Sequence, residues 1–273
     1  MVEKNKEVVD EIKKDLSEGD RSPFEGLQDY NTLPYGYEDK KGKLHREVEF
    51  RELKGSDEEE ISQGAVRNNI GKIVTILLAN CTKRIGDYTK ENMQKAQWEE
   101  IFRDMYIGDR DALLLYISEW TYGKEIDFDS RCPVCRESLI ISFETGELEW
   151  QDPPTDPGHL EFTLPRGYKD NEGVIHNRGV VRMPNGLDQE LLDKPARKNP
   201  GKGNTMLITR CMQELGNAKL SGGLFRDIGQ KDRQQITKVM SDNVYGPLFE
   251  VKTVCDSCGS EFTAGVNPVN FIL

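Results

Sequence analysis

The chain has 273 residues, long enough for two domains of ordinary size. It carries 37 Lys and Arg residues against 48 Asp and Glu, a formal net charge of −11. Most of the surface should therefore repel a phosphate backbone, and no basic patch stands out, so nucleic-acid binding is disfavoured. No apolar run reaches the about 20 residues that span a bilayer, and the N-terminus lacks the apolar stretch of a secretory signal. We expect a soluble protein made in the cytoplasm, with no membrane contact.

The first 28 residues are rich in charge. Val8, Val9, Ile12 and Leu16 recur there at helical spacing, and Gly19 follows where such a helix would stop. This narrow apolar stripe predicts either a surface helix packed loosely on its own domain or a docking helix for a partner.

The remainder contains an internal repeat. Residues 33–59 match residues 164–190 at a constant offset of 131 (164 − 33), with eleven identical positions. In the first copy these are Leu33, Pro34, Gly36, Tyr37, Asp39, Gly42, His45, Arg51, Gly55, Asp57 and Glu59. The pattern predicts a β-hairpin that turns between Asp39 and Gly42, with Val48 and Phe50 facing inward on the returning strand.

Helical signals follow each hairpin. Ser56 and Glu59 form a capping-box pattern, which predicts a helix from Asp57. Residues 69–85 are predicted to form a buried helix, and their partner is residues 206–215 at an offset of 130. Cys81 and Cys211 occupy matching positions and are expected to be small apolar core residues. Residues 201–205, GKGNT, lack the spacing of a phosphate loop and are expected to form an ordinary loop.

A second register links residues 107–135 to residues 230–258 at an offset of 123 (232 − 109). Asp109 and Arg110 recur there as Asp232 and Arg233. We expect a structural role, in which the aspartate caps its helix and the arginine pairs with a carboxylate such as Asp104. The three histidines, His45, His159 and His176, are likewise expected to be structural or solvated.

Each half ends in a C-x-x-C pair, Cys132 and Cys135 in the first, Cys255 and Cys258 in the second. Such a pair can bring two thiolates to one Zn²⁺, and structural zinc takes four ligands. The pairs are 119 residues apart (255 − 135 − 1), but two halves packed about a pseudo-twofold axis could share one metal. Separate or intermolecular sites remain alternatives, as do redox or plain structural cysteines. Thioredoxin-like chemistry is disfavoured because a strand pattern, not a helix, follows Cys135.

These patterns predict an α+β protein with an internal duplication. Each homologous half has a β-hairpin, a helical middle and a zinc knuckle, and the halves share one four-cysteine site. The expected organisation is a charged segment at 1–28, a first repeat at 29–150, a proline-rich linker at 151–158 and a second repeat at 159–273. The zinc is expected to stabilise the fold. No nucleophile and base occur in a catalytic pattern, so we expect no enzymatic activity and no small-molecule substrate.

Residues 107–135, IGDRDALLLYISEWTYGKEIDFDSRCPVC, resemble the baseplate hub-subunit family of T-even-type contractile-tailed phages and related injection particles. The likeness rests on the I-G-D-R start, the Leu-rich helix, the Tyr-Gly step and C-P-x-C, together with R-x-x-x-G-x-D-E at 51–58. The second half departs from it at Lys231 and Asp256, which stand at the positions of Gly108 and Pro133. The resemblance implies a non-enzymatic structural or assembly protein of the baseplate hub, with hub or tail proteins as partners. It is expected in the cytoplasm during assembly and, if it is a structural subunit rather than a transient assembly factor, also in the mature tail. The alternative is a zinc-ribbon adaptor that contacts nucleic acid or the transcription machinery.

Overall fold

The computed structural model describes residues 32–63, 66 and 68–266. The helix expected within residues 2–17 lies outside the described residues.

The first predicted hairpin is confirmed. Strands β1 (Thr32–Glu38) and β2 (Leu44–Phe50) pair in antiparallel fashion. The turn between them is held by Asp39, whose carboxylate accepts the backbone N–H groups of Lys41 and Lys43, at 2.8 and 3.0 Å. Gly42 takes a φ of +78° there, which glycine adopts without steric cost. Val48 is buried, and Phe50 is half-buried and stacks on the ring of Tyr116.

The next helix begins two residues before the predicted start. Helix α2 spans Gly55–Ile61, and the carboxylate that caps it belongs to Asp57, which accepts the backbone N–H of Lys54 at 2.9 Å. The capping-box assignment to Ser56 and Glu59 was therefore wrong. Asp57 also forms an ion pair of 2.7 Å with Arg51 at the end of the hairpin, so the same carboxylate fixes the helix to the strand before it.

The long helix predicted over residues 69–85 is two elements. Helix α3 (Ile70–Cys81) begins after Asn69, whose side chain caps it by accepting the N–H of Lys72. It ends at Cys81, and residues Thr82–Ile85 form strand β3, which pairs with β2. Ile85 lies four residues after Cys81, which is also the spacing of one helical face, so helical spacing alone did not reveal the junction.

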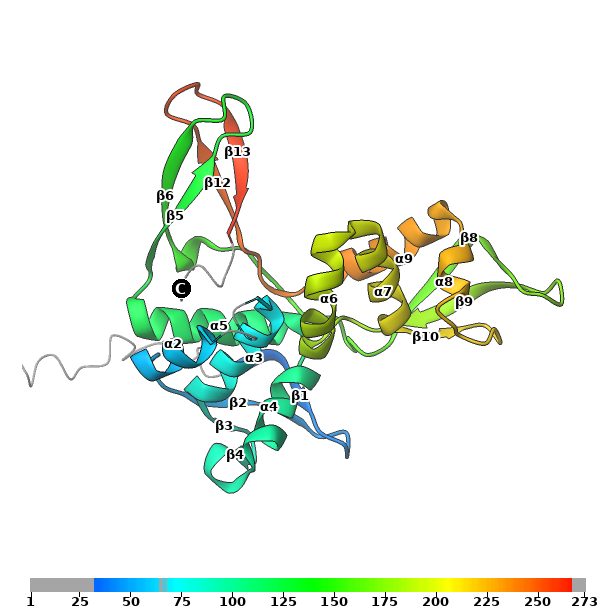
Figure 1. Ribbon diagram of the computed structural model, residues 1–273, viewed down its shortest axis with the longest axis horizontal. Helices are drawn as coiled ribbons and strands as arrows, with labels where there is room; N and C mark the ends of the chain where they lie inside the picture. Colours follow the sequence, from blue (N-terminus) through cyan, green and yellow to red (C-terminus); the bar gives the residue numbers. More distant parts are fainter. Residues whose placement is uncertain (1–31, 64–65, 67, 267–273) are drawn as a thin grey trace, which may run out of the picture. The chain divides into compact units, whose positions relative to one another are not determined.

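A short strand, a 3-10 turn and two helices follow β3. They are β4 (Tyr88–Thr89), the 3-10 turn η1 (Lys90–Asn92), α4 (Lys95–Asp104) and α5 (Ile107–Tyr122). The strands order as β1-β2-β3-β4 in one sheet, and α5 lies against it (Figure 1). Most positions of α5 are buried around its whole circumference, as the predicted apolar run implies.

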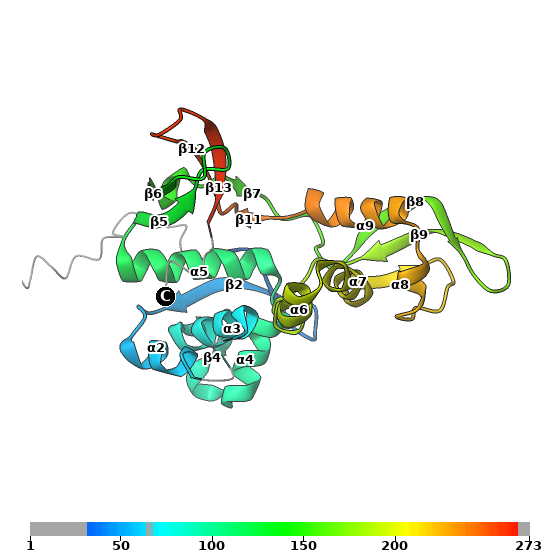
Figure 2. The same cartoon turned by 45° about the horizontal axis from the view of Figure 1, so that its top comes forward.

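The cysteine-bearing segments form two-stranded hairpins. Strand β5 (Glu125–Arg131) pairs with β6 (Ser138–Glu144), and β12 (Glu250–Val254) pairs with β13 (Glu261–Gly265). Figures 1 and 2 show the two hairpins side by side. The short 3-10 turn η2 (Thr145–Glu147) follows the first hairpin, and strands β7 (Trp150–Gln151) and β11 (Gly246–Pro247) pair near the bases of both. The strand predicted after Cys135 is therefore confirmed.

The second half repeats the order of the first. Its elements are β8 (Leu160–Lys169), β9 (Ile175–Val181), α6 (Gly186–Lys198), α7 (Pro200–Cys211), β10 (Met212–Leu215), α8 (Leu224–Asp227) and α9 (Gln230–Asp242). The predicted helix at 206–215 again divides, here into α7 and β10. Residues 201–205 are not a loop but the start of α7, because Asn199 caps the helix and Pro200 takes its first position.

Matched positions in the two halves make the same polar contacts. Each half has an arginine–aspartate ion pair behind its hairpin, a histidine bonded to the turn aspartate, an asparagine cap, and an arginine that reaches a phenylalanine carbonyl and a threonine hydroxyl. The first half has Arg51–Asp57, His45–Asp39, Asn69–Lys72 and Arg110 with Phe102 and Thr75. The second has Arg182–Asp188, His176–Asp170, Asn199–Lys202 and Arg233 with Phe225 and Thr205. The likeness thus extends from sequence to contacts.

One segment differs between the halves. The offset between matching residues falls from 130 to 123, and the first half has β4 and η1 at this point. In the second half the sheet order is β10-β9-β8, and within the described residues no strand pairs with the outer edge of β10. The chain turns back after β10 without forming a strand: the N–H of Ala218 donates to the carbonyl of Leu215 at 3.0 Å, and Leu215 forms an isolated bridge with Asn217.

Helix α6 packs on the first half. A Cβ atom at Gly71 of α3 would lie only 2.4 Å from the backbone nitrogen of Glu190, so glycine is needed for this close approach. The Glu190 carboxylate accepts hydrogen bonds from Thr75 at 2.7 Å and Arg103 at 3.0 Å. These contacts join the halves. Within the second half, an apolar cluster fills the space between the β8–β10 sheet and helices α7 to α9. Among the described residues, no helix is both long enough and apolar enough to cross a membrane.

Candidate metal centre

The two C-x-x-C segments have the same backbone geometry. In the first, the N–H of Cys132 donates to the carbonyl of Glu137 at 3.0 Å, and the N–H of Arg136 donates to the carbonyl of Cys132 at 2.9 Å. The second repeats both bonds 123 residues later, from Cys255 to Ser260 and from Gly259 to Cys255, at 3.0 and 2.8 Å. Each turn thus directs its two thiols to the same side.

The turn places one residue in the left-handed region. Arg136 has a φ of +64°, and Gly259 has a φ of +70° at the matching position. Arginine adopts this conformation at some steric cost, whereas glycine does not. The first turn therefore holds a mildly strained residue one step beyond Cys135. Sequence reasoning missed this feature, although the offset of 123 aligned the two positions.

The four cysteines come together, one pair from each hairpin. Their Sγ atoms all lie within 4.8 Å of one another. Two approaches between the hairpins are 3.7 Å, between Cys132 and Cys258, and 3.6 Å, between Cys135 and Cys255. Cys132 matches Cys255 and Cys135 matches Cys258, so a twofold axis between the hairpins would convert one of these sulfur pairs into the other. The near equality of the two distances is what such local symmetry would give.

These separations fit a tetrahedral metal and not a disulfide. Sulfurs at about 2.3 Å from a tetrahedral Zn²⁺ lie roughly 3.8 Å apart, whereas bonded sulfurs lie about 2.05 Å apart. All four cysteines are free thiols. Cys132 and Cys255 are buried, and Cys135 and Cys258 are exposed. The donor set and its spacing therefore suit one structural zinc ion, with one buried and one exposed ligand from each hairpin.

The local electrostatics act unequally on the thiols. The Ser260 hydroxyl, 3.3 Å from the sulfur of Cys258, lowers the pKa of that thiol to about 6. Backbone N–H groups of Cys135 and Val134 lower the pKa of Cys132. For Cys135 the Glu137 N–H also lowers the pKa, but burial and the neighbouring thiols outweigh it and raise the pKa to about 12. Thiolates this close repel one another, so a cation among them would favour ionisation of the whole set.

Asp109 and Arg110 are structural, but not in the way the sequence suggested. Asp109 does not cap its own helix. Its buried carboxylate accepts the backbone N–H groups of Tyr35 and Gly36, both at 2.9 Å, and the hydroxyl of Tyr245 at 2.6 Å. It therefore ties α5 to β1 and to the segment that leads into β11. Burial raises its pKa to about 6 in spite of these donors.

Arg110 does not pair with Asp104. Its guanidinium is fully buried and donates to backbone carbonyls of Phe102 and Gly71 and to the side chains of Thr75 and Gln189. Neutral oxygens thus replace the expected carboxylate. Because Gln189 lies on α6, this arginine also links the two halves.

The histidines take the expected structural positions. His45 and His176 are both buried. The Nε2 atom of His45 lies 3.3 Å from the carboxylate of Asp39, and that of His176 lies 2.9 Å from the carboxylate of Asp170, in the turn of the same hairpin. His159 is exposed, as predicted. None of the three lies in the four-cysteine cluster.

The fold and the cluster define an α+β protein in which four cysteines from two distant hairpins meet. A family model described as T4 bacteriophage base plate protein matches residues 31–270. The chain therefore belongs to this family of phage baseplate proteins, which confirms the resemblance at the level of the family. No curated protein and no solved structure matches it.

Proposed function

We propose that the chain is a non-enzymatic structural or assembly protein of the baseplate hub, in a contractile phage tail or a phage-like injection particle. The observation that carries this proposal is the family match, which extends over nearly the whole chain. The partners are other baseplate or tail hub proteins. The protein is made and acts in the cytoplasm during assembly; as a structural subunit it then takes its place in the tail, and as an assembly factor it does not. It needs neither nucleic acid nor a small-molecule substrate.

In this proposal Cys132, Cys135, Cys255 and Cys258 hold one structural zinc ion. The support is the free state of the four thiols and their mutual distances, within 4.8 Å. A zinc ion with all four ligands supplied by cysteine has no open coordination position for a substrate, which favours stability over catalysis.

The chain also arose, in this proposal, by internal duplication. Repeats at 29–150 and 159–273 are joined by a linker at 151–158 and preceded by a separate segment at 1–28. Support comes from the matched contacts: Arg233 reaches Phe225 and Thr205 as Arg110 reaches Phe102 and Thr75. Chance would rarely reproduce a helix cap, an ion pair and an arginine with the same two partners in one order.

The decisive experiment is quantitative mass spectrometry of sheath-containing particles pelleted from producing cells, compared with the unassembled soluble pool. A structural subunit gives peptides in the pellet at a fixed ratio to hub proteins. An assembly factor is found only in the soluble pool, bound to hub precursors. If the chain follows neither, the proposal fails, and a gel shift with random DNA at several salt concentrations would then test the adaptor alternative.

A further inference from the structure

Helix α6 begins on a polar docking surface of the first half. Its Glu190 carboxylate accepts hydrogen bonds from Thr75 of α3 at 2.7 Å and from Arg103 of α4 at 3.0 Å. The side chain of Gln189 accepts one from Arg110 of α5 at 3.2 Å. Two arginines and a threonine therefore hold the first part of α6.

Glycines on both sides make this close approach possible. A Cβ atom at Gly71 of α3 would overlap the backbone of Gln189 and Glu190, and one at Gly186 of α6 would overlap the guanidinium of Arg110. Neither glycine has a positive φ. Close packing, not backbone conformation, is therefore what requires glycine at these two positions.

The second half carries the same docking surface. At the positions of Gly71, Thr75, Arg103 and Arg110 it has Gly201, Thr205, Arg226 and Arg233. The Thr205 hydroxyl accepts a hydrogen bond from Arg233 at 3.0 Å and donates one to the carbonyl of Gly201 at 3.0 Å. Arg226 is exposed, and in the described part of the chain it forms no ion pair. The side chains of a docking surface are in place there without the carboxylate that Glu190 supplies to the first half.

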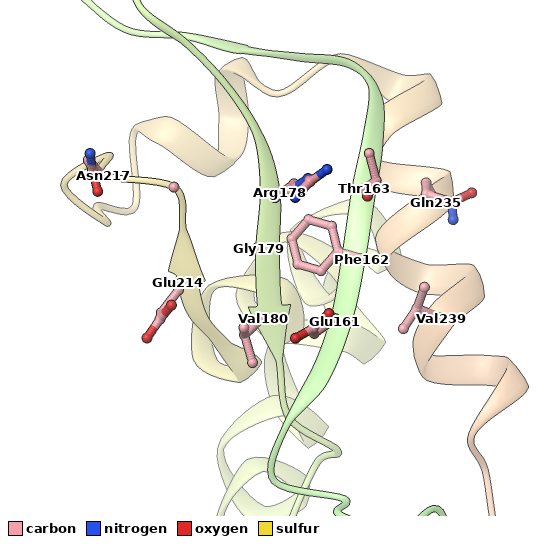
Figure 3. Close-up of a pocket in the computed structure, with 11 residues that line it drawn as sticks. Glu161, Phe162, Thr163, Arg178, Gly179, Val180, Glu214, Asn217, Gln235 and Val239 are labelled. Atoms are coloured by element: carbon pink, nitrogen blue, oxygen red, sulfur yellow. The ribbon is translucent and has the colours of Figure 1, made fainter.

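An open groove of about 390 Å³ lies at this surface, between α7 and α9. Asn204 of α7 and Arg233 and Thr237 of α9 are among the residues that line it. The other side of α9 is used within the second half, because Val239 faces the β8–β9 sheet and lines a separate pocket with Phe162 (Figure 3). The face of α9 that bears Arg233 is therefore the one available to a partner.

The chain also carries a second helix of the α6 kind. Helix α2 is the repeat counterpart of α6, and in place of Gly186, Gln189 and Glu190 it has Gly55, Glu58 and Glu59. All three are exposed, and neither glutamate forms an ion pair with a described residue. The ion pair of Asp57 fixes α2 to its own half, as the matching pair fixes α6. Helix α2 thus presents two carboxylates that complement the two arginines of the second docking surface.

The glycines of α2 and α7 have no function that the contacts within the chain explain. A Cβ atom at Gly55 would meet nothing within 4 Å, and one at Gly201 would meet only a side-chain oxygen at 3.4 Å. Neither residue has a positive φ. Glycine in a helix costs up to about 1 kcal/mol relative to alanine. A close helix contact between these two positions, like that between Gly186 and Gly71, would account for both.

We propose that α2 of one copy of this chain docks on the surface formed by α7, α8 and α9 of another copy, as α6 docks on α3, α4 and α5 within each chain. Glu59 then pairs with Arg226 and Glu58 with Arg233, and the two glycines permit the close approach. The two surfaces lie on different halves, so each copy offers one of each. Such a head-to-tail contact repeats from copy to copy and builds a ring or an open row. The inference does not depend on the baseplate function.

The test is sedimentation equilibrium of the full-length chain over a range of concentrations, in reducing buffer without a chelator. We expect the average mass of wild type to rise with concentration. Gly55→Ala blocks the helix and Gly201→Ala blocks the surface that receives it, so each should raise the dissociation constant at least about tenfold. The matched control is Gly146→Ala, at another exposed glycine where a Cβ would meet nothing within 4 Å. It should associate as wild type does.

An equimolar mixture of the two variants gives the sharpest result. The surface of the Gly55→Ala chain and the helix of the Gly201→Ala chain are both intact, so the mixture should form dimers with one native contact and nothing larger. Arg226→Glu should weaken association of the otherwise wild-type chain at least about tenfold, because it places a carboxylate opposite Glu59. None of these substitutions should lower the melting temperature, since each lies on an exposed position.

Three results would overturn the proposal. They are a wild-type chain that stays monomeric at every concentration, glycine variants that associate like the control, and a mixture of the two variants that associates no better than either one alone. The first of these would leave the docking surface to a helix of another protein.

Discussion

The hydrogen bond from Tyr245 to Asp109 gives the sharpest test of how the chain is held together. The Asp109 carboxylate is fully buried, and one of its oxygens accepts two backbone N–H groups while the other accepts the Tyr245 hydroxyl at 2.6 Å. Tyr245→Phe removes the third donor and keeps the ring, which packs against Gly108. The substitution therefore changes one hydrogen bond to a buried charge and little else.

The expected cost depends on pH. A hydrogen bond to a charged group contributes about 1.5–3 kcal/mol, and one between neutral groups about 0.5–1.5 kcal/mol. Burial raises the pKa of Asp109 from 3.8 to about 6, so the contribution of this group to stability is complete below pH 3.8 and is lost as the pH rises through 6. The loss amounts to roughly 3 kcal/mol for a shift of this size. Without the tyrosine hydroxyl, which lowers this pKa, the carboxyl becomes protonated at still higher pH. We therefore expect Tyr245→Phe to cost about 2–3 kcal/mol at pH 8 and about 1 kcal/mol at pH 5.5.

Urea denaturation at both pH values measures these free energies, with wild type and variant run side by side so that any effect of pH on the cysteines cancels. The control is Tyr35→Phe, which removes a hydroxyl that, within the described residues, bonds only to the exposed carboxylate of Glu38, at 3.3 Å. It should cost less than about 0.5 kcal/mol. A cost for Tyr245→Phe that is the same at both pH values would show that Asp109 does not change its charge in this range. A cost no larger than that of the control would refute the role of the bond.

Three further predictions use the metal site and the repeat. Elemental analysis of wild type should give about one zinc ion per chain, and Cys258→Ser should remove it. Chelation of the wild-type zinc should lower the melting temperature. An unchanged zinc content in the variant would refute the shared four-cysteine site. Gly108→Ala should cost about 1–3 kcal/mol, because the added Cβ would lie 2.5 Å from a packed tyrosine ring, whereas Lys231→Ala at the matching exposed position should change the denaturation midpoint little. Gly71→Ala should likewise destabilise by about 2–3 kcal/mol, since its Cβ would meet the α6 backbone at 2.4 Å. Gly201→Ala, whose Cβ would meet only a side-chain oxygen at 3.4 Å, should be neutral or slightly stabilising; equal effects of the two substitutions would refute the packing of α6 on α3.

Features with strong local rules could be predicted from the sequence. The hairpin turn at Asp39 was evident because only a short polar side chain and a following glycine satisfy that turn, and the structure uses both. The cysteines were found because C-x-x-C is a short motif that is visible in the sequence alone, and the strand pattern after Cys135 favoured a metal over redox chemistry. Their meeting across 119 residues followed only from the repeat, since no local rule joins such distant segments.

Features decided by tertiary contacts could not be predicted. The end of α3 at Cys81 depends on β2, which offers Thr82 and Ile85 a strand to pair with, and propensity at the junction carries no such information. Asp109 was assigned to its own helix because a cap is the commonest use of an aspartate there. Its actual partners lie 73, 74 and 136 residues away along the chain.

The placement of the cysteine cluster limits what a metal there can stabilise. A cross-link that closes a loop of about 120 residues would contribute roughly 5 kcal/mol by chain entropy alone. The strand pair β7–β11 already joins the same two segments, however, at Gln151 and Gly246. Once that pair has formed, Gln151 lies 16 positions after Cys135 (151 − 135) and Cys255 lies 9 positions after Gly246 (255 − 246). A metal would then close a loop of about 25 residues, worth roughly 3.5 kcal/mol. A metal at this site would therefore fix the hairpins to each other, whereas the buried contacts of α5 and α6 hold the two halves together.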